Sequence, residues 1–330
     1  MDVTGELALR CPACAAPLHA EDRFCEACGA EVGAPAPAAA AGCRACGAPR
    51  DAIGDDGYCT VCGVRERAPG QRAEADLGIA AAVSEQGRSH RRNEDAFHLE
   101  RVGERDVVAV VCDGISTAAS GDVAARAAAA AAGAILAEAL RDGGDLAAAT
   151  AAAVHAAGRA VQEVPWVTSR AALALPSCTL VSAACRGGEI VVGWIGDSRA
   201  YWLAPDDARQ LTIDDSWAAE QVAEGRLSLE EAEADHRAHS ITRWVGADAP
   251  PDAPHVTNLR PATGGRLVLC TDGLWNAASA PADLADLLDG APDAPAAVAH
   301  RFADAAMELA GRDDVTVAVV DVDPEGAHGP

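Results

Sequence analysis

The feature that most constrains the fold of this chain is a short apolar run that ends in Asp-Gly. Residues 106–114 read D-V-V-A-V-V-C-D-G, which is typical of a strand buried on both faces. Asp113 stands where this strand leaves the core, and Gly114 lets the backbone approach a neighbouring group closely. One such Asp-Gly usually marks a turn, so a single copy would carry little meaning.

Two further apolar runs also end in an aspartate. Residues 266–273 read R-L-V-L-C-T-D-G and contain Asp272, and V-V-G-W-I-G-D-S-R contains Asp197. Three strands that each deliver a carboxylate to a rim indicate one shared acidic pocket. Acidic pairs at 94–95 and 313–314 flank two more segments of the same region, although an isolated pair is more typical of a solvated surface.

The order of apolar patterns predicts an α+β domain. Strands are predicted at residues 77–84, 178–185, 189–196, 199–203, 255–259, 266–270 and 315–322, in addition to the one that ends at Asp113. Helices are predicted at residues 121–140, 146–164, 282–288 and 294–309, and residues 212–247 are predicted to form a helical, acid-rich surface flap.

The charge of the chain argues against nucleic acid or an anionic membrane as its main partner. The formal net charge is −24, and all 26 basic residues are arginine. The acidic N-terminus M-D-V-T-G-E lacks the apolar core of a secretory signal. The apolar run 127–140 carries Glu138 and is short for a bilayer span, which favours a core helix. We therefore expect a soluble, cytoplasmic protein.

Eight of the twelve cysteines lie in the first 62 residues as four C-x-x-C pairs. Ten residues separate the first two pairs and twelve separate the last two, and two such knuckles can complete a tetrahedral zinc site. Disulfides and redox motifs are the alternatives, but a cytoplasmic chain without a surrounding βαβ pattern disfavours both. The predicted zinc ligands are Cys11, Cys14, Cys25, Cys28, Cys43, Cys46, Cys59 and Cys62.

This N-terminal pattern resembles the double zinc ribbon family over residues 9–64. Each block is too small to build a core, so two structural Zn²⁺ ions would supply the folding energy. Residues 1–66 carry ten Asp or Glu against five Arg, which is not the basic footprint of a nucleic-acid binder. A protein partner is therefore the predicted role of the ribbons.

The boundaries follow from these patterns. We predict two zinc ribbons within residues 1–65 (11–28 and 43–62), a polar linker at 66–76, the large α+β domain at 77–323 and a tail at 324–330.

The motifs of the large domain, taken in order, resemble the metal-dependent protein phosphatase family, also called phosphatase 2C-like. They are R-x-N-E-D, V-x-x-V-C-D-G, G-D-S-R-A-Y, C-T-D-G-L-W and D-D-V-T-V, and the resemblance covers about residues 77–323. The resemblance implies a four-layer α-β-β-α sandwich, in which two antiparallel sheets are flanked by helices. It also implies two Mn²⁺ or Mg²⁺ ions at one end of the sandwich.

The resemblance implies a role for each acidic residue. Asp113 would bridge both ions and the carbonyl of Gly114 would bind one. Asp272 and Asp313 would hold the other ion, and the three aspartates form the catalytic set. Glu94 and Asp95 would anchor waters that are coordinated to the ions. Asp197 would face a third ion that binds more weakly.

The sequence departs from the family at several positions. The arginine with which the family binds substrate phosphate, four residues before Glu94, is replaced by His90. Arg88, Arg91 and Arg92 lie close by in the sequence and could help to bind the phosphate, and of these Arg91 is predicted to assist His90. Asn276 stands where many members carry a further acid, which weakens the third ion site. Asp314 stands where the family commonly has asparagine.

The expected function is hydrolysis of phosphoserine and phosphothreonine in phosphorylated proteins, including substrates of Ser/Thr kinases, by a water activated between two metal ions. The alternative is a catalytically weak or inactive phosphatase-like protein with a regulatory or docking role. A nucleic-acid binder that acts through the ribbons is disfavoured by their acidity.

Overall fold

The computed structural model describes residues 9–10, 17–18, 43, 47–54, 58–63, 71–118, 120–166, 175–249, 253–288 and 294–324. The chain divides into two compact units, Met1–Ala68 and Pro69–Pro330. In the first unit, β1 (Leu9–Arg10) pairs with β2 (Pro17–Leu18), and a 3₁₀ turn covers Arg50–Ala52. Cys11, Cys14, Cys25, Cys28 and Cys46 lie outside the described residues, so the predicted zinc-ribbon fold stays a prediction.

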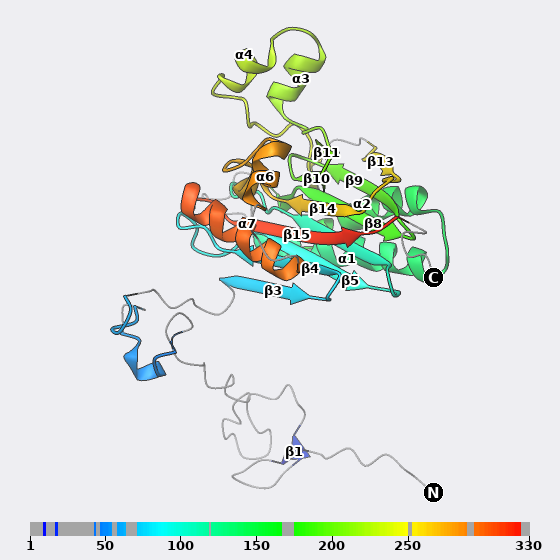
Figure 1. Ribbon diagram of the computed structural model, residues 1–330. Helices are drawn as coiled ribbons and strands as arrows, with labels where there is room; N and C mark the ends of the chain where they lie inside the picture. Colours follow the sequence, from blue (N-terminus) through cyan, green and yellow to red (C-terminus); the bar gives the residue numbers. More distant parts are fainter. Residues whose placement is uncertain are drawn as a thin grey trace, which may run out of the picture. The chain divides into compact units, whose positions relative to one another are not determined.

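Two antiparallel sheets form the second unit (Figure 1). The six-stranded sheet has the order β11 (Asp207–Gln210), β10 (Arg199–Ala204), β14 (Gly265–Cys270), β15 (Val315–Val322), β4 (Ala80–Glu85) and β3 (Arg72–Asp76). The five-stranded sheet has the order β13 (His255–Leu259), β9 (Glu189–Ile195), β8 (Leu180–Arg186), β6 (Val107–Cys112) and β5 (Ala96–Arg101). A small ladder joins β7 (Ser177–Cys178) to β12 (Val245–Gly246).

Helices cover the outer face of each sheet. Two long helices, α1 (Gly121–Arg141) and α2 (Leu146–Gln162), pack on the five-stranded sheet. On the six-stranded sheet lie α5 (Asp272–Trp275), α6 (Pro281–Leu287) and α7 (Pro295–Leu309). The predicted α+β sandwich of two antiparallel sheets flanked by helices is therefore confirmed.

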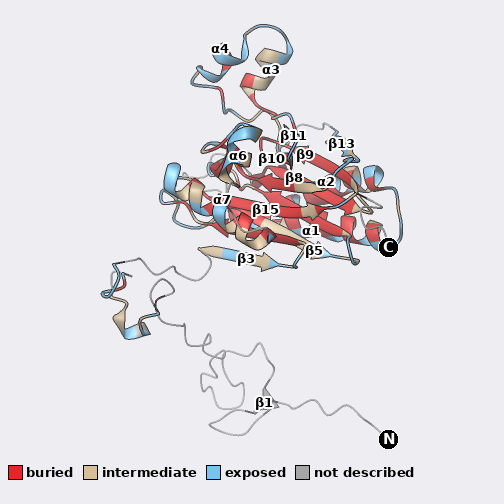
Figure 2. Ribbon diagram, viewed as in Figure 1, coloured by how far each residue is buried: buried red, intermediate tan, exposed pale blue. Residues whose placement is uncertain are grey.

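The sequence of strand β6 is apolar without interruption because both faces of the strand are buried. Successive strand residues point to opposite faces, and both faces of β6 are covered. Val108, Val110 and Cys112 lie in the cluster beneath α1 and α2. Val107, Ala109 and Val111 lie in the cluster between the two sheets. Figure 2 shows this buried interior, with the exposed residues concentrated on the outer helices and loops.

Helix α1 is long and apolar enough to cross a membrane by length and composition, and half of its most apolar 18-residue window is buried. Ala124, Ala128 and Leu136 are among the residues of α1 in the cluster beneath the helices. Small side chains of this kind let α1 lie close to α2 and to the sheet. The packing is that of a core helix.

Four strands of the second unit were not predicted: β3, β5, β11 and the two-residue β12. Residues 72–76, assigned to the linker, form β3, which pairs with β4. The edge strands β5 and β11 are half-buried or exposed along much of their length, so their apolar pattern is weak.

The flap is less helical than predicted. Within residues 212–247 the helices are α3 (Trp217–Ala223) and α4 (Leu229–Glu233), each started by a serine cap, at Ser216 and Ser228. The rest of this range forms loops and turns, apart from the two-residue strand β12 near its end.

Candidate metal centre

The acidic residues stand at strand ends that meet at one end of the sandwich. Asp113 follows β6, and Asp197 follows β9 by two residues. These strands run in the same direction because each pairs antiparallel with β8, which lies between them. From the other sheet come Asp272, two residues after β14, and Asp313, two residues before β15. The shared pocket predicted from three strand ends is therefore built by both sheets.

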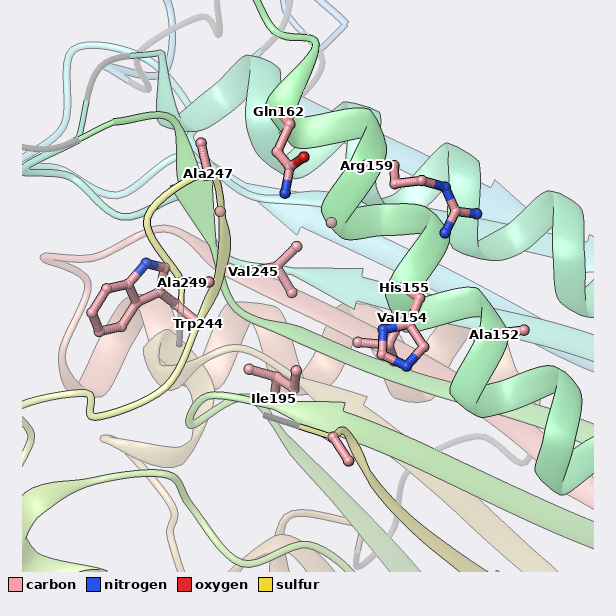
Figure 3. A pocket seen from close by; sticks show the side chains of 13 residues that line it. Ala152, Val154, His155, Arg159, Gln162, Ile195, Trp244, Val245, Ala247 and Ala249 are labelled. Atoms are coloured by element: carbon pink, nitrogen blue, oxygen red, sulfur yellow. The ribbon is translucent and has the colours of Figure 1, made fainter. Parts of the chain in front are cut away.

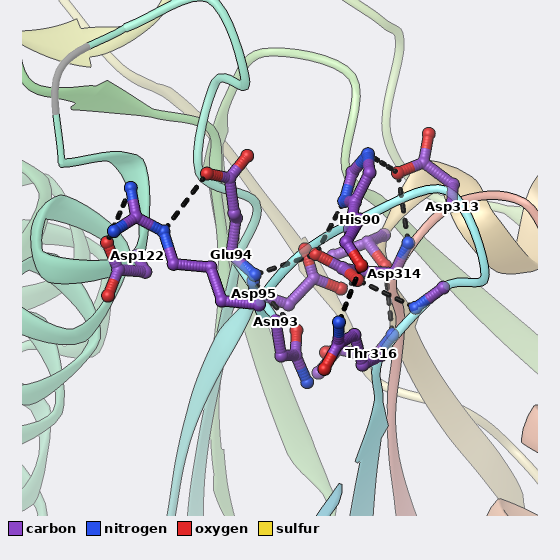
Figure 4. Close-up of polar contacts among 12 residues, drawn as sticks. His90, Asn93, Glu94, Asp95, Asp122, Asp313, Asp314 and Thr316 are labelled. Carbon is purple, nitrogen blue, oxygen red and sulfur yellow. Dashed lines mark hydrogen bonds and ion pairs between the residues drawn. The ribbon is translucent and has the colours of Figure 1, made fainter. Parts of the chain in front are cut away.

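Asp314, immediately before β15, forms hydrogen bonds with the segment that precedes β5. Its Oδ1 accepts a hydrogen bond from the backbone N–H of Gly87 at 2.8 Å. Its Oδ2 accepts from the backbone N–H of Glu94 at 2.7 Å and lies 2.9 Å from Nδ1 of His90 (Figure 4). These bonds fix Glu94 and Asp95 beside Asp313, although 218 residues separate Asp95 from Asp313 in the sequence.

Two further hydrogen bonds position the buried aspartates. Thr271 donates from its hydroxyl to Oδ2 of Asp95 at 2.9 Å, and its Oγ1 accepts from the backbone N–H of Thr316. The indole Nε1 of Trp275 donates to the carbonyl of Asp197 at 2.9 Å. The side chain of Asp95 is therefore held from the six-stranded sheet, and so is the backbone of Asp197.

The carboxyl groups raise one another's pKa values. Burial raises the pKa of Asp113, and the charges of Asp95, Asp272, Asp197 and Asp313 raise it further. Burial followed by the charge of Asp272 raises the pKa of Asp197 to about 8. Burial followed by the charge of Asp313 raises the pKa of Asp272 to about 6. Such shifts identify a site in which a cation would relieve both desolvation and repulsion.

The donor set fits a hard divalent cation. Oδ1 of Asp95 and Oδ1 of Asp272 are buried and have no hydrogen-bond partner among the described residues. A buried carboxylate oxygen without a partner is costly, and these two belong to the same acidic cluster. Mn²⁺ and Mg²⁺ prefer oxygen ligands of this kind.

Glycines are required where the segments cross. A Cβ on Gly114 would lie 2.5 Å from the carbonyl carbon of Gly121 and 2.6 Å from the carbonyl oxygen of Glu94. A Cβ on Gly87 would lie 2.2 Å from the carbonyl carbon of Asp313. The backbone N–H of Gly114 also donates to the carbonyl of Glu94 at 3.1 Å, which fixes the position of the Gly114 peptide beside the acids.

The two residues predicted for the substrate phosphate occupy different environments. His90 is held by Asp314 at 2.9 Å and by Asp313, whose Oδ1 lies 3.4 Å from Nε2. Burial favours the neutral ring, but the hydrogen bond and charge of Asp314 outweigh it and raise the pKa of His90. Arg91 is exposed.

Sequence reasoning did not assign roles to four residues that contact the site. Asp314 was noted as an acidic neighbour of Asp313 and as a departure from the family's asparagine, and Thr271 and Trp275 appeared only within a motif. Asp122, the second residue of α1, forms an ion pair with Arg92 at 3.3 Å (Figure 4). The sequence signal for Asp122 is its place in the first turn of α1, immediately after Gly121.

In the first unit, three of the predicted zinc ligands lie together. The sulfur atoms of Cys43, Cys59 and Cys62 all lie within 4.8 Å of one another, and those of Cys43 and Cys62 are 3.6 Å apart. A hydrogen bond from the backbone of Cys62 lowers the pKa of the Cys59 thiol to about 7. Three thiols in this arrangement could hold a metal ion.

Residues of the second unit line two cavities. One of about 730 Å³ is lined by flap residues and by Arg199, Trp275 and Asn276, and Nδ2 of Asn276 donates to Asp272 at 3.3 Å. The other, of about 820 Å³, lies between α2 and residues 244–249, where His155 and Gln162 face Trp244 (Figure 3).

Comparison with known proteins agrees with this architecture. A profile for the family described as Protein phosphatase 2C matches residues 86–305, more than half of the chain. The chain belongs to the protein phosphatase 2C family. It is 33% identical over 244 residues to the serine/threonine protein phosphatase PstP of Mycobacterium tuberculosis. That match covers 73% of this chain but only 44% of PstP.

Solved structures show the same relationship. The crystal structure of the M. tuberculosis phosphatase PstP/Ppp is 29% identical and superposes with a TM-score of 0.60, covering 74% of this phosphatase 2C family member and 98% of that chain. The catalytic domain of PstP, solved in complex with two manganese ions, is 30% identical with a TM-score of 0.57, covering 74% of this chain and 97% of that one. The family resemblance predicted from the motifs is confirmed.

Proposed function

We propose that this protein is a Mn²⁺- or Mg²⁺-dependent phosphatase that hydrolyses phosphoserine and phosphothreonine in proteins. The observation that carries the proposal is the convergence of carboxyl groups from both sheets on one end of the sandwich, where they raise one another's pKa values. Membership of the phosphatase 2C family and the likeness to a manganese-loaded PstP catalytic domain support it.

The residues proposed to hold two cations are those assigned by the motifs. They are the carboxylates of Asp113, Asp272 and Asp313 and the carbonyl of Gly114, with Glu94 and Asp95 holding coordinated waters and Asp197 facing a weaker third ion. Two such ions, when bound, lower the pKa of a water and screen the phosphoryl oxygens.

The protein's own part in the reaction is positioning. Asp314 holds the backbone at Glu94, and Thr271 orients Asp95. Trp275 holds the backbone at Asp197. Because these bonds fix the carboxylates before substrate arrives, little rearrangement is needed during the reaction.

The competing proposal is a docking protein that retains the fold without turnover. One measurement distinguishes the phosphatase proposal from the docking proposal. It compares hydrolysis of a phosphothreonine peptide by the full chain in Mn²⁺ with hydrolysis by the same protein in EDTA. We expect turnover in Mn²⁺ and none in EDTA, with Asp113→Asn as the inactive control. A folded wild-type protein that binds Mn²⁺ but releases no phosphate would favour the docking role.

We further propose that the first unit contains two structural zinc sites and contacts a protein partner. The three clustered thiols support the second site, with Cys46 as its fourth ligand, and the other four cysteines of the N-terminal pattern would form the first. Four thiolates leave no open position for water, so the metal would be structural. Elemental analysis should find two zinc ions per chain. Replacing Cys59 by serine should release one of them and leave phosphatase activity on a small substrate unchanged.

The cytoplasmic location, the absence of nucleic-acid and membrane partners, and the phosphorylated substrates of Ser/Thr kinases stay predictions of the sequence.

A further inference from the structure

Four basic side chains lie close together just before Glu94, and the structure separates their environments. His90 has a carboxylate at each ring nitrogen, Asp314 at 2.9 Å and Asp313 at 3.4 Å, and its side chain is 21% exposed. A phosphate dianion at this ring would have to displace one of these carboxylates and then lie beside both. His90 therefore orients the acids of the site and is poorly placed to bind an anion.

Arg88 is directed away from the acids. Its Nη2 donates to the carbonyl of Met307 at 2.8 Å, at the C-terminal end of α7. This contact complements the carbonyl groups of the last helical turn. Arg88 therefore serves the helix terminus rather than the acidic pocket.

Arg92 is held at the rim of the pocket. Its Nε lies 3.4 Å from Oε1 of Glu94, and its Nη2 lies 3.3 Å from Oδ1 of Asp122. The Arg92 side chain is 54% exposed, whereas those of Glu94 and Asp122 are 14% and 12% exposed. Glu94 and Asp122 lie on one side of the site, and His90, Asp313 and Asp314 lie on the other (Figure 4).

The two contacts leave much of the guanidinium available. In the part of the chain that the structure describes, they are the polar contacts of this side chain, and a guanidinium carries five N–H donors. Both are longer than the 2.7–2.9 Å of a strong charge-assisted bond, so they orient Arg92 without saturating it. The backbone beneath is fixed, because Asn93 donates to Ser84 at 2.8 Å and accepts from the N–H of Asp95 at 3.0 Å.

We propose that Arg92 binds the phosphoryl group of the substrate, a role that rests on the proposed phosphatase function. The planar fork of an arginine matches two oxygens of a phosphate monoester. Arg92 precedes Glu94 by two residues and presents this fork beside the Glu94 carboxylate. The other charged groups around the site are mostly negative. In this chain Arg92 contacts the substrate phosphate, and His90 orients the carboxylates of Asp313 and Asp314.

The test compares Arg92→Gln with Arg126→Gln in the full-length protein loaded with Mn²⁺. Arg126 also pairs with Asp122, at 2.8 Å, and its side chain is 57% exposed, so it is a matched control that removes the same charge beside the same carboxylate. The measurements are kcat and KM for para-nitrophenyl phosphate, the inhibition constant of inorganic phosphate, and the Mn²⁺ concentration that gives half-maximal activity. Direct titration of inorganic phosphate by calorimetry adds a readout that needs no turnover.

We expect Arg92→Gln to raise KM and weaken phosphate binding together by about tenfold or more, as for the loss of a charged hydrogen bond. kcat and the Mn²⁺ requirement should change little. Arg92→Lys should fall between wild type and Arg92→Gln, because it keeps the charge and loses the fork. Arg126→Gln should resemble the wild type.

Phosphate binding that is unchanged in Arg92→Gln would overturn the proposal, and so would an equal loss in Arg126→Gln. A shift confined to the Mn²⁺ requirement would also overturn it, because Arg92 would then only support Glu94. Wild-type protein that binds phosphate through Arg92 without hydrolysing the ester would contradict the phosphatase function alone. Wild-type protein that binds no phosphate would contradict the Arg92 proposal as well.

Discussion

Replacing Asp272 by asparagine should abolish metal-dependent hydrolysis and yet stabilise the metal-free protein. Burial and the neighbouring Asp313 raise the pKa of Asp272 from 3.8 to about 6. One pKa unit corresponds to about 1.4 kcal/mol, so the ionised carboxylate costs the folded state ~3 kcal/mol at neutral pH. Asparagine has nearly the same shape and carries no charge, and therefore removes this cost.

The sign of the pH dependence follows from the raised pKa. Below about pH 3, well under the ordinary pKa of 3.8, the carboxyl group is protonated in the folded and unfolded states alike, so wild type and Asp272→Asn should be equally stable. As the pH rises towards 6, the unfolded chain ionises more readily and the wild type loses stability relative to the variant. Above about pH 6 the difference should be constant.

Thermal unfolding in EDTA at pH 3 and pH 7.5 tests this reasoning. A difference of ~3 kcal/mol corresponds to a Tm increase of roughly 6–12 °C for a domain of this size. Asp286→Asn, at an exposed position of α6, is the matched control and should leave Tm unchanged. Added Mn²⁺ should stabilise the wild type much more than the variant. An Asp272→Asn protein that is less stable than wild type in EDTA at both pH values would refute the electrostatic account.

Three other predictions follow from the same geometry. Asp113→Asn should lose Mn²⁺-dependent hydrolysis while circular dichroism stays that of the wild type, and retention of a substantial kcat would contradict the two-metal assignment. Gly87→Ala should lower Tm and activity, at a cost of about 1–3 kcal/mol, because the new Cβ would lie 2.2 Å from the carbonyl carbon of Asp313. Gly158→Ala, where a Cβ meets nothing within 4 Å, should leave both unchanged or raise Tm. Removal of residues 1–68 should leave hydrolysis of a small phosphomonoester near normal, and its collapse would show that the first unit supports catalysis.

The acids at strand ends were predictable because each one interrupts an apolar run. Asp113, Asp197 and Asp272 all follow strands whose sequences are apolar on both faces. A carboxylate cannot continue such a run at low cost, so it marks the point where the strand leaves the core. The direction of the strands then places these acids at one end of the sandwich.

Edge strands were not predictable in the same way. The strand β3 reads R-A-E-A-D and owes its conformation to pairing with β4, whose residues are all buried. Arg72, its first residue, has a side chain only 7% exposed and lies 2.6 Å from Glu85. These charged residues are buried only because β3 pairs with β4, and a short sequence window does not contain this information. A short run of polar residues such as this one is therefore predicted to be a linker.

The role of Asp314 also lies beyond what adjacency in sequence can indicate. Its two oxygens accept from Gly87 and Glu94, which lie more than 200 residues away in the chain. The motif D-D-V-T-V, through the family resemblance, assigned Asp313 to the ion site and gave Asp314 no role. Only the crossing of two backbone segments distinguishes Asp314, which organises the site, from Asp313, which is half-exposed and faces His90.

The placement of the acids across two sheets explains why their repulsion persists in the folded protein. If the carboxylates stood on one flexible loop, they would move apart and their pKa values would return to normal. Here Thr271 holds Asp95 from the opposite sheet, and strands buried on both faces fix the backbone at Asp113 and Asp272. The packing of the sandwich therefore opposes relaxation of the acidic end. A divalent cation is the ligand that removes this cost, so stability without metal and activity with metal should change in opposite directions when an acid of the cluster is neutralised.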